Sequence, residues 1–295
     1  MRAQAFVGVR KLLKRVRQAA YVGSHPLPHR ACAAVIRSSR LPFDRKTSLK
    51  YVGDHLALSL STSQRREVLV AHYSTFPSFL RPPCLAELGH GITVWEKSVG
   101  DDLPHLSITL ERSMLAPMEG ELQLRFSFKT DLYVLTFSVG PGHVLGVADT
   151  TVLFIGGVQG RIGSREEVRE AARLNSELSP RALLVLAAQA LARAIDVDEI
   201  IAVGEDEHIS RAYAEAQMSF DYAQFWTKVG GVRVGRHYRL PMESPHKPLA
   251  LVVASHRSRA RRRREIKHAI RDALDLRFRQ LIEPRSRVSC VAETT

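Results

Sequence analysis

The chain has 295 residues, of which 45% are hydrophobic, and a formal net charge of +13 at pH 7. This length allows one large domain, or a small domain attached to a larger one, with a sizeable core. No transmembrane helix is predicted, because the sequence has no window of 18 uncharged apolar residues. The three cysteines, Cys32, Cys84 and Cys290, lie far apart, which argues against a disulfide framework and a zinc ribbon and favours a reducing compartment, the cytoplasm.

The net charge is unevenly distributed along the chain. Residues 1–66 contain 14 Lys and Arg against 2 acidic residues, residues 257–287 contain 12 against 4, and the body between them is mildly acidic. Basic ends of this kind attract phosphate groups on nucleic acid, anionic lipid or lipopolysaccharide. The alternative interpretation is that both ends are solvated surface.

The N-terminal part has helical patterns. Phe6, Val9, Leu13 and Val16 recur at helical spacing among basic residues, which predicts an amphipathic helix that lies on an anionic membrane or docks on its own domain. Two prolines predict a loop at "SHPLPHR", and a helix is expected from residue 62 until just before Pro77. We therefore expect a helical, basic region over residues 1–100.

Residues 103–140 are rich in β-forming residues. The blocks "LPHLSITLERS", "GELQLRFSFKT" and "LYVLTFSVG", with a short polar turn at "KTD", predict an antiparallel meander. A further strand, Thr151 to Phe154, is expected to join it. The strand is followed by Gly156, Gly157, Gly160 and Gly163, which predict either a sharp turn or a place where a ligand approaches the backbone closely.

The pattern after the glycines becomes helical. Ser164 with Glu167 resembles a capping box, predicting a helix over 164–174, and Ser179 with Pro180 begins a largely apolar, buried helix. "EIIAVG" predicts a buried strand. Next we expect a helix around 208–218 and then an aromatic helix end. These are followed by an alternating strand to Leu240 and a long basic helix from about Ala254. The fold class is mixed α/β, with an antiparallel meander and crossover helices over residues 101–295.

The glycine stretch is a candidate phosphate site. Backbone N–H groups at a glycine-rich turn before a helix bind phosphate well, so we assign Gly156, Gly157, Gln159, Gly160 and Gly163 to cofactor binding. The spacing does not match the dinucleotide fingerprint or the P-loop. A β-bulge with a tight turn is the alternative.

The order of elements also resembles the N-acyltransferases of the GNAT type. These enzymes place an antiparallel meander before a splayed strand, a glycine loop whose helix holds the coenzyme A pyrophosphate, and later an aromatic helix end. "QGRIG" and "FWTKVGG" resemble the two motifs, and the resemblance implies a GNAT-like core with acyl-CoA as the cofactor. The glycine spacing differs, an extra helix intervenes, and Trp226 replaces the usual Tyr that protonates the leaving thiolate.

A second resemblance covers most of the chain, from about Glu67 to the basic C-terminal helix. The strings "IGGVQG", "YAQFW" and "YRLP" resemble the VirK/YbjX family of Gram-negative bacteria. This resemblance implies roles in virulence, in resistance to cationic antimicrobial peptides and in the display of proteins on the outer surface, with some members associated with the membrane. It implies no particular reaction.

Three residues are candidates for catalysis. His208 follows the predicted strand "IIAVG", the end at which α/β proteins place ligands, and histidine is a common acid–base group, although a structural histidine is the alternative. Asp221 and Tyr222 precede the aromatic helix end, where an Asp–Tyr pair can orient a proton donor or the aspartate can cap the helix. No metal site is predicted, because His25, His29 and Cys32 have no fourth partner nearby.

The basic C-terminal helix is a candidate phosphate- or lipid-binding element. Its basic cluster consists of Arg257, Arg259, Arg261, Arg262, Arg263 and Arg264. Arginines spread around a helix suit phosphate contact without sequence-specific readout, so nucleic acid is the less favoured partner.

Two function classes remain open. One is an acyl- or aminoacyl-transferring protein of the bacterial envelope, in the cytoplasm or peripheral at the inner membrane. The other is a non-catalytic adaptor that binds anionic lipid or nucleic acid through its Arg-rich ends. The chain has no G-x-S-x-G elbow and no H-E-x-x-H motif, which weakens the serine hydrolase and zinc protease classes.

Overall fold

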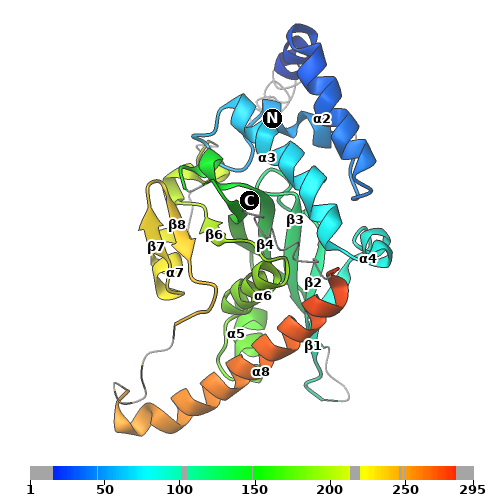
Figure 1. Ribbon diagram of the computed structural model, residues 1–295. Coiled ribbons are helices and arrows are strands. Elements are labelled where there is room, and N and C mark those ends of the chain that lie inside the picture. The colour runs from blue at the N-terminus through cyan, green and yellow to red at the C-terminus, as the bar shows by residue number, and fades with distance from the viewer. Residues whose placement is uncertain are drawn as a thin grey trace, which may run out of the picture.

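The structure is a computed structural model that describes residues 16–44, 46–100, 105–147, 149–212, 220–245, 248, 250 and 252–283. An α/β fold is confirmed, with helices packed around one sheet (Figure 1). The strands are β1 (Ile92–Lys97), β2 (Leu106–Arg112), β3 (Leu122–Phe128), β4 (Thr130–Pro141), β5 (Thr151–Gly160), β6 (Glu199–Ala202), β7 (Val232–Val234) and β8 (His237–Leu240). The helices are α2 (Pro26–Ser38), α3 (Thr62–Thr75), α4 (Pro82–Glu87), α5 (Arg165–Leu174), α6 (Pro180–Ala194), α7 (Tyr222–Lys228) and α8 (Arg257–Leu281).

The sheet has eight strands in the order β1-β2-β3-β4-β5-β6-β8-β7. The expected antiparallel meander is confirmed: β2, β3 and β4 pair as neighbours, and Lys129 turns between the last two with a φ of 59°. Strands β5 and β6 are parallel, whereas every other described pair is antiparallel. A parallel pair needs a crossover connection, and α5 and α6 supply it.

The two parallel strands run together over only part of β5. Their ladder covers Val152 to Ile155, and one more bond joins the Val203 N–H to the Ile155 carbonyl. Strand β5 then continues along β4 as far as Gly160, paired with Tyr133. The C-terminal half of β5 therefore has a partner on one side only, and a gap opens between β5 and the segment after β6.

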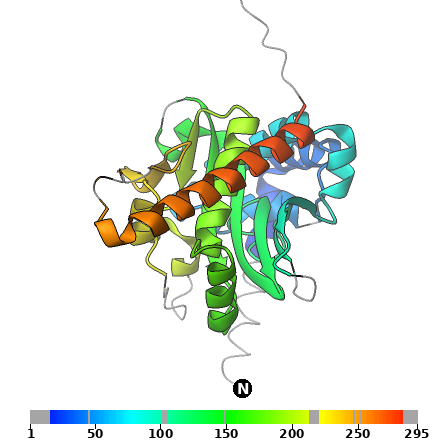
Figure 2. The ribbon, with the colours of Figure 1, turned by 90° about the horizontal axis from the view of Figure 1, so that it is seen from below.

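Helix α6 forms the centre of the core on one face of the sheet. It begins as the sequence predicts, with Pro180 in the first turn and the Ser179 hydroxyl accepting a hydrogen bond from the Ala182 N–H. Its long buried apolar run packs against β3 and β4. Helix α8 crosses α6 on this face (Figure 2). Its buried residues, Ile270, Leu274, Phe278 and Leu281, recur every three or four positions in its C-terminal half.

Helix α3 packs beside β4 and supplies a hydrogen bond to it. The His72 ring accepts at Nδ1 from the Val139 N–H at 3.1 Å, beyond the end of the β3 ladder, and stacks on Phe76. The helix starts with a complete capping box between Ser61 and Gln64. Its end before Pro77, predicted from the sequence, is confirmed.

Several local expectations are wrong. "SHPLPHR" is not a loop, because α2 begins at Pro26, in the first turn, where a proline costs no hydrogen bond. Ser164 forms no capping box, since its hydroxyl donates to the Arg161 carbonyl instead. The single strand expected up to Leu240 is a hairpin of β7 and β8 that turns at Gly235 with a φ of 57°.

Other expectations lie partly outside the described residues. Most of the amphipathic helix over Phe6 to Val16 does so, and the helix expected around 208–218 has only short 3₁₀ turns in its described part, Glu205–Glu207 and Ile209–Ala212. The domain boundary at residue 100 stays a prediction, although β1 lies before it in the same sheet. Within the described ranges, no helix combines the length and apolar character needed to cross a bilayer.

Candidate functional site

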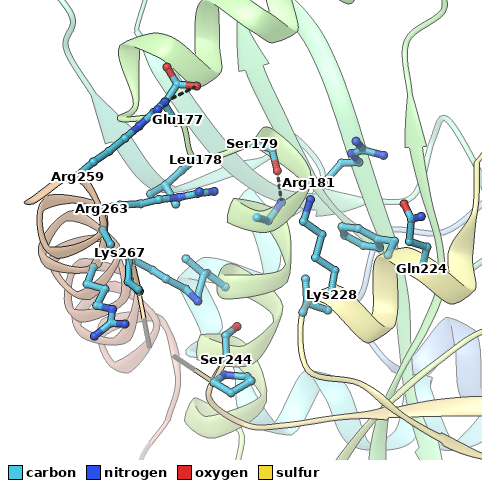
Figure 3. Close-up of a pocket in the computed structure, with 18 of the residues that line it drawn as sticks. Glu177, Leu178, Ser179, Arg181, Gln224, Lys228, Ser244, Arg259, Arg263 and Lys267 are labelled. Atoms are coloured by element: carbon cyan, nitrogen blue, oxygen red, sulfur yellow. Dashed lines mark hydrogen bonds and ion pairs between the residues drawn. The ribbon is translucent and has the colours of Figure 1, made fainter. Parts of the chain in front are cut away.

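A pocket of about 960 Å³ lies between the N-terminus of α6, helix α7 and the N-terminal half of α8 (Figure 3). Its lining is rich in positive charge contributed by all three helices. The charged side chains that line it are Glu177, Arg181, Asp221, Lys228, Arg259, Arg263, Arg264 and Lys267. We call this the basic pocket.

Most of these cations are not neutralised by a neighbouring carboxylate. Arg259 faces Glu177 at 3.8 Å, which is a long ion pair between exposed side chains. Within the described part of the chain, no carboxylate lies within 4 Å of the basic groups of four others, Arg181, Lys228, Arg263 and Lys267.

The positive groups also repel one another. Burial lowers the pKa of Lys267, and the nearby charges of Arg263 and Arg271 lower it further. The concentration of charge is therefore costly, and a bound anion would relieve that cost. The N-terminus of α6 contributes partial positive charge to the same pocket, since Ser179 and Arg181 both line it.

One wall of the basic pocket is aromatic. The Arg181 guanidinium lies 5.0 Å from the centre of the Phe220 ring and 5.7 Å from that of Phe225, within cation–π range. Phe220 in turn packs edge-on against Tyr222, with ring centroids 4.7 Å apart. This wall joins the basic pocket to a polar cluster buried behind it.

The buried cluster consists of Tyr222, His208 and Glu119. The His208 Nε2 atom lies 3.0 Å from the Tyr222 hydroxyl and 3.3 Å from Glu119 Oε1. All three side chains are almost fully buried. On the other side of its ring, His208 Nδ1 lies 2.7 Å from the Ser210 hydroxyl and accepts a bond from the Ser210 N–H. A neutral His208 that accepts at Nδ1 carries its proton on Nε2, facing Tyr222 and Glu119.

Tyr222 lies in the gap where β5 and β6 diverge. Its hydroxyl accepts from the Val158 N–H at 3.0 Å and donates to the Val158 carbonyl at 3.2 Å. The phenol thus takes the place that a neighbouring strand would occupy along this half of β5. Burial raises the pKa of Tyr222, followed by the negative charge of Glu119, so the phenol stays protonated at neutral pH.

The turn expected directly after Phe154 is wrong. Gly156, Gly157 and Gly160 lie within β5, and the register with β4 shifts so that Gly156 is an extra residue. This is the β-bulge that the sequence left open as the alternative. The turn itself comes later, where Gly163 has a φ of 83°.

Glu119 explains why two of these glycines are needed. A Cβ on Gly156 would overlap the Glu119 carbonyl, and a Cβ on Gly157 would overlap the Glu119 carboxylate. Gln159, two residues further along β5, donates its side-chain amide to Glu119 Oε1. The five residues proposed as cofactor ligands stay a prediction in that role, while the structure gives Gly156, Gly157 and Gln159 a place around Glu119.

The candidate arginines of α8 divide into two groups. Arg259, Arg263 and Arg264 line the basic pocket, whereas Arg257, Arg261 and Arg262 are exposed and lie outside its lining. Asp221 lines the pocket and caps α7 by accepting from the Gln224 N–H at 2.8 Å. Trp226 is fully buried, as expected, and donates to the Val203 carbonyl.

Sequence reasoning missed several residues of the site. Arg181, Lys228 and Lys267 come from three different helices, α6, α7 and α8, so no local pattern in the sequence brings them together. Glu119 lies in the connection before β3, outside any periodic pattern. The sign that could have found it is the pair Gly156–Gly157 inside an apolar strand, which requires another segment to approach closely.

A second buried carboxylate, Glu121, lies two residues from Glu119 and belongs to a separate cluster. Its side chain binds Lys50 at 2.9 Å, His55 at 3.1 Å and the Tyr73 hydroxyl at 2.9 Å. The positive charge of Lys50 and the contact with His55 hold the pKa of Glu121 well below its usual range, although burial alone would raise it. Glu121 therefore remains charged and structural.

Comparisons with known proteins identify the family. The family described as "Protein of unknown function (DUF535)" matches residues 44–275. "Uncharacterized protein YbjX" of Escherichia coli (strain K12) is 31% identical over 242 residues, which are 76% of this chain and 70% of that protein. The chain belongs to the VirK/YbjX family.

The family match confirms the resemblance seen in the sequence, and its range, residues 44–275, includes every residue that lines the basic pocket. A second relative, an "Uncharacterized protein" of Haemophilus influenzae (strain ATCC 51907 / DSM 11121 / KW20 / Rd), is 30% identical over 158 residues, 51% of each chain. No solved structure matches this VirK/YbjX chain.

Proposed function

We propose that this VirK/YbjX protein is a GNAT-like acyl- or aminoacyltransferase of the bacterial envelope, which holds a phosphate-bearing acyl donor in the basic pocket. The observation that carries the proposal is the position of that pocket. It lies at the N-terminus of α6, the helix that enters the second strand of the parallel pair β5–β6. In GNAT enzymes the crossover helix at this point holds the pyrophosphate of coenzyme A.

The order of elements supports this assignment. An antiparallel meander leads to β5, β5 and β6 diverge after a short parallel ladder, and an aromatic helix, α7, precedes the final hairpin. Two features depart from the GNAT pattern. Helix α5 is inserted before α6, and the glycines of "GGVQG" belong to the strand itself.

The residues of the basic pocket fit coenzyme A. Arg181, Lys228, Arg263 and Lys267 offer positive charge that no carboxylate in the described residues neutralises, which suits a ligand with several phosphates. The rings of Phe220 and Phe225 offer apolar faces for a nucleobase. The volume of about 960 Å³ is at the upper end of the range for small-molecule sites.

The buried cluster can move protons next to this pocket. When bound, an acyl thioester supplies the acyl group and the leaving thiol. Tyr222 can donate its phenolic proton at Oη to the leaving thiolate, and the Glu119 carboxylate can accept a proton from the incoming amine and return it to the Tyr222 oxygen. His208 Nε2 lies 3.0 Å from the Tyr222 hydroxyl and 3.3 Å from Glu119 Oε1, so its N–H orients both groups.

Calorimetric titration with CoA, acetyl-CoA and a long-chain acyl-CoA tests the proposal. We expect binding to the native chain, and affinity weakened about tenfold or more in the double variant Arg263→Ala/Lys267→Ala, because two charge-assisted contacts are lost. The matched control is Arg261→Ala/Arg262→Ala, which removes the same charge from the same helix outside the pocket lining. No heat with any of these ligands at millimolar concentration would refute the donor site.

A second candidate function rests on the other arginines. The N-terminal half of α8 extends away from the sheet (Figure 1) and exposes Arg257, Arg261 and Arg262 to solvent. This favours a non-catalytic adaptor that binds anionic lipid. Flotation with phosphatidylglycerol vesicles tests it: binding should be lost in Arg261→Ala/Arg262→Ala and kept in Arg263→Ala/Lys267→Ala. A steep salt dependence with DNA or RNA, and no flotation, would favour nucleic acid instead.

A further inference from the structure

A second, largely apolar pocket of about 630 Å³ lies at the end of β4 and β5 nearest Gln159. We call it the apolar pocket. Its lining combines aliphatic side chains and one aromatic ring with a few polar groups. The residues that line it are Leu115, Thr130, Asp131, Leu132, Tyr133, Val134, Gln159, Gly160 and Arg161. None of these residues lines the basic pocket, so a ligand of the basic pocket does not account for the apolar pocket.

The rim of the apolar pocket exposes large aliphatic side chains. Leu115 is 61% exposed, its neighbour Met114 is 66% exposed, and Ile162, next to the lining residue Arg161, is 98% exposed. Large apolar side chains exposed in or beside the lining of a pocket are typical of a surface that contacts an apolar partner. The volume and the rim together suit an alkyl chain that enters from outside.

The polar end of the same pocket leads to Glu119. Gln159 lines the pocket, and its amide nitrogen donates to Glu119 Oε1. Glu119 is 5% exposed, and its carboxylate also accepts from the Thr136 hydroxyl at 3.3 Å and lies 3.3 Å from His208 Nε2. Within the described residues, no lysine or arginine nitrogen lies within 4 Å of it. Glu121, two residues away, is neutralised by Lys50 at 2.9 Å. A buried carboxylate without a cation is costly, so a ligand's ammonium group at this point would be favoured.

The apolar and basic pockets adjoin each other. The Arg181 guanidinium, which lines the basic pocket, lies 5.6 Å from the centre of the Tyr133 ring, which lines the apolar pocket. A donor and an acceptor held in the two pockets would meet near Gln159 and the buried cluster. This is the juxtaposition that a transfer between two substrates requires.

We propose that the apolar pocket binds the acceptor substrate, and that this acceptor is an amphipathic primary amine. Its alkyl chain packs on Leu115 and the Tyr133 ring, and its ammonium group replaces the Gln159 amide at Glu119. That the bound amine acts as an acceptor rests on the proposed transferase function, whereas the binding of an alkyl amine in this pocket does not. The alkyl amine comes either from a free amphiphile or from an aminophospholipid.

The test uses n-dodecylamine, n-propylamine and dodecanoate as probes in calorimetry, each below its micelle concentration. We expect dodecylamine to bind at least about tenfold more tightly than propylamine, because the chain buries apolar surface, and dodecanoate not to bind, because Glu119 repels a carboxylate. The double variant Leu115→Asp/Ile162→Asp should weaken dodecylamine binding about tenfold or more. The matched control Leu276→Asp, at an exposed leucine on α8, should leave it unchanged.

A second pair of variants tests whether the charge of Glu119 is needed for amine binding. Gln159→Ala removes only the side chain over Glu119 and should retain or increase amine affinity, whereas Glu119→Gln should lower it about tenfold. Equal binding of dodecylamine and dodecanoate, or no effect of Leu115→Asp/Ile162→Asp in a folded protein, would overturn the proposal. Flotation with vesicles containing phosphatidylethanolamine, compared with phosphatidylcholine alone, distinguishes the lipid source from the free one.

The outcomes separate this inference from the proposed function. Binding of CoA without dodecylamine would remove the amphipathic acceptor and keep the donor site. Binding of dodecylamine without CoA, lost in Leu115→Asp/Ile162→Asp, would keep the amine site and remove the transferase.

Discussion

Glu119 and Glu121 are separated by one residue and are both buried, yet only Glu121 is paired with a lysine. The Lys50 Nζ atom lies 2.9 Å from Glu121 Oε2, whereas the basic side chain within 4 Å of Glu119 in the described residues is His208, at 3.3 Å. The difference separates a carboxylate that stabilises the fold, Glu121, from the one for which we propose a role in proton transfer, Glu119. Variants of the two carboxylate environments should therefore give different experimental results.

Removal of the Lys50 charge should destabilise the protein strongly. Lys50→Met leaves the buried Glu121 carboxylate without its cation, so we expect the free energy of unfolding to fall by about 3–5 kcal/mol. Urea denaturation at pH 7 measures it. Lys129→Met breaks the half-exposed pair with Glu170 and should cost less than about 1 kcal/mol. Similar losses in the two variants would contradict the structural role of Glu121.

Stability should fall as the pH drops from 7 to 5. Burial lowers the pKa of His72 from 6.5 to about 4. The unfolded chain therefore binds a proton at a pH where the folded chain does not, and this residue alone costs about 2 kcal/mol between pH 7 and pH 5. The lowered pKa of Glu121 acts in the same direction at lower pH, because its stabilisation is lost as the folded carboxylate becomes protonated.

Urea denaturation at the two pH values checks this. The variant His72→Leu should be less stable at pH 7, because the buried Val139 N–H loses its acceptor, and its stability should depend less on pH. The exposed His143, whose pKa is raised mainly by its hydrogen bond to Asp149, acts in the opposite sense. A stability that rises between pH 7 and pH 5 would show that the surface histidine dominates.

Alanine at the glycines of β5 should be tolerated poorly. The Cβ of Gly157→Ala would overlap the Glu119 carboxylate, so we expect a loss of about 1–3 kcal/mol. Gly156→Ala meets backbone instead of a side chain and should cost more. Gly23→Ala, on a helix with nothing near its added Cβ, is the control and should be neutral or stabilising. Thermal denaturation of the three variants compares them.

Removal of one hydroxyl tests the proposed acid. Tyr222→Phe leaves the buried Val158 N–H without its acceptor and should cost about 1–3 kcal/mol of stability. If Tyr222 also donates a proton during transfer, kcat should fall by about 10²–10⁴ with little change in KM for the donor. A folded variant that keeps the native kcat would show that the phenol only bridges the gap beside β5.

The parts of the fold that the sequence predicts are those governed by local chemistry. Ser179 followed by Pro180 specifies the start of α6, and the polar turn at "KTD" specifies the hairpin of β3 and β4. These signals depend on neighbouring residues only. The local signal at Pro26 is ambiguous for the same reason, since a proline is equally suited to a loop and to the first turn of a helix.

The parts that it does not predict are decided by distant contacts. Gly156 and Gly157 look like the end of a strand, and only the approach of Glu119 shows why they belong inside one. His208 and Tyr222 could be named as candidates from their positions, but their shared partner, Glu119, comes from an earlier connection. The basic pocket is assembled from three helices, so no single segment carries its pattern.

The attachment of α8 has a consequence for the pocket that it borders. Ile270, Leu274 and Phe278 anchor its C-terminal half, and the Arg81 N–H bonds to the Leu281 carbonyl at its far end. Arg259 and Arg263 project from the opposite half, which has no buried apolar residue. The two halves of the helix are therefore held unequally, because buried apolar residues lie only in the C-terminal half. We expect amide hydrogen exchange to be faster around Arg259 and Arg263 than around Leu274 and Phe278, since a segment with few buried apolar contacts opens more readily.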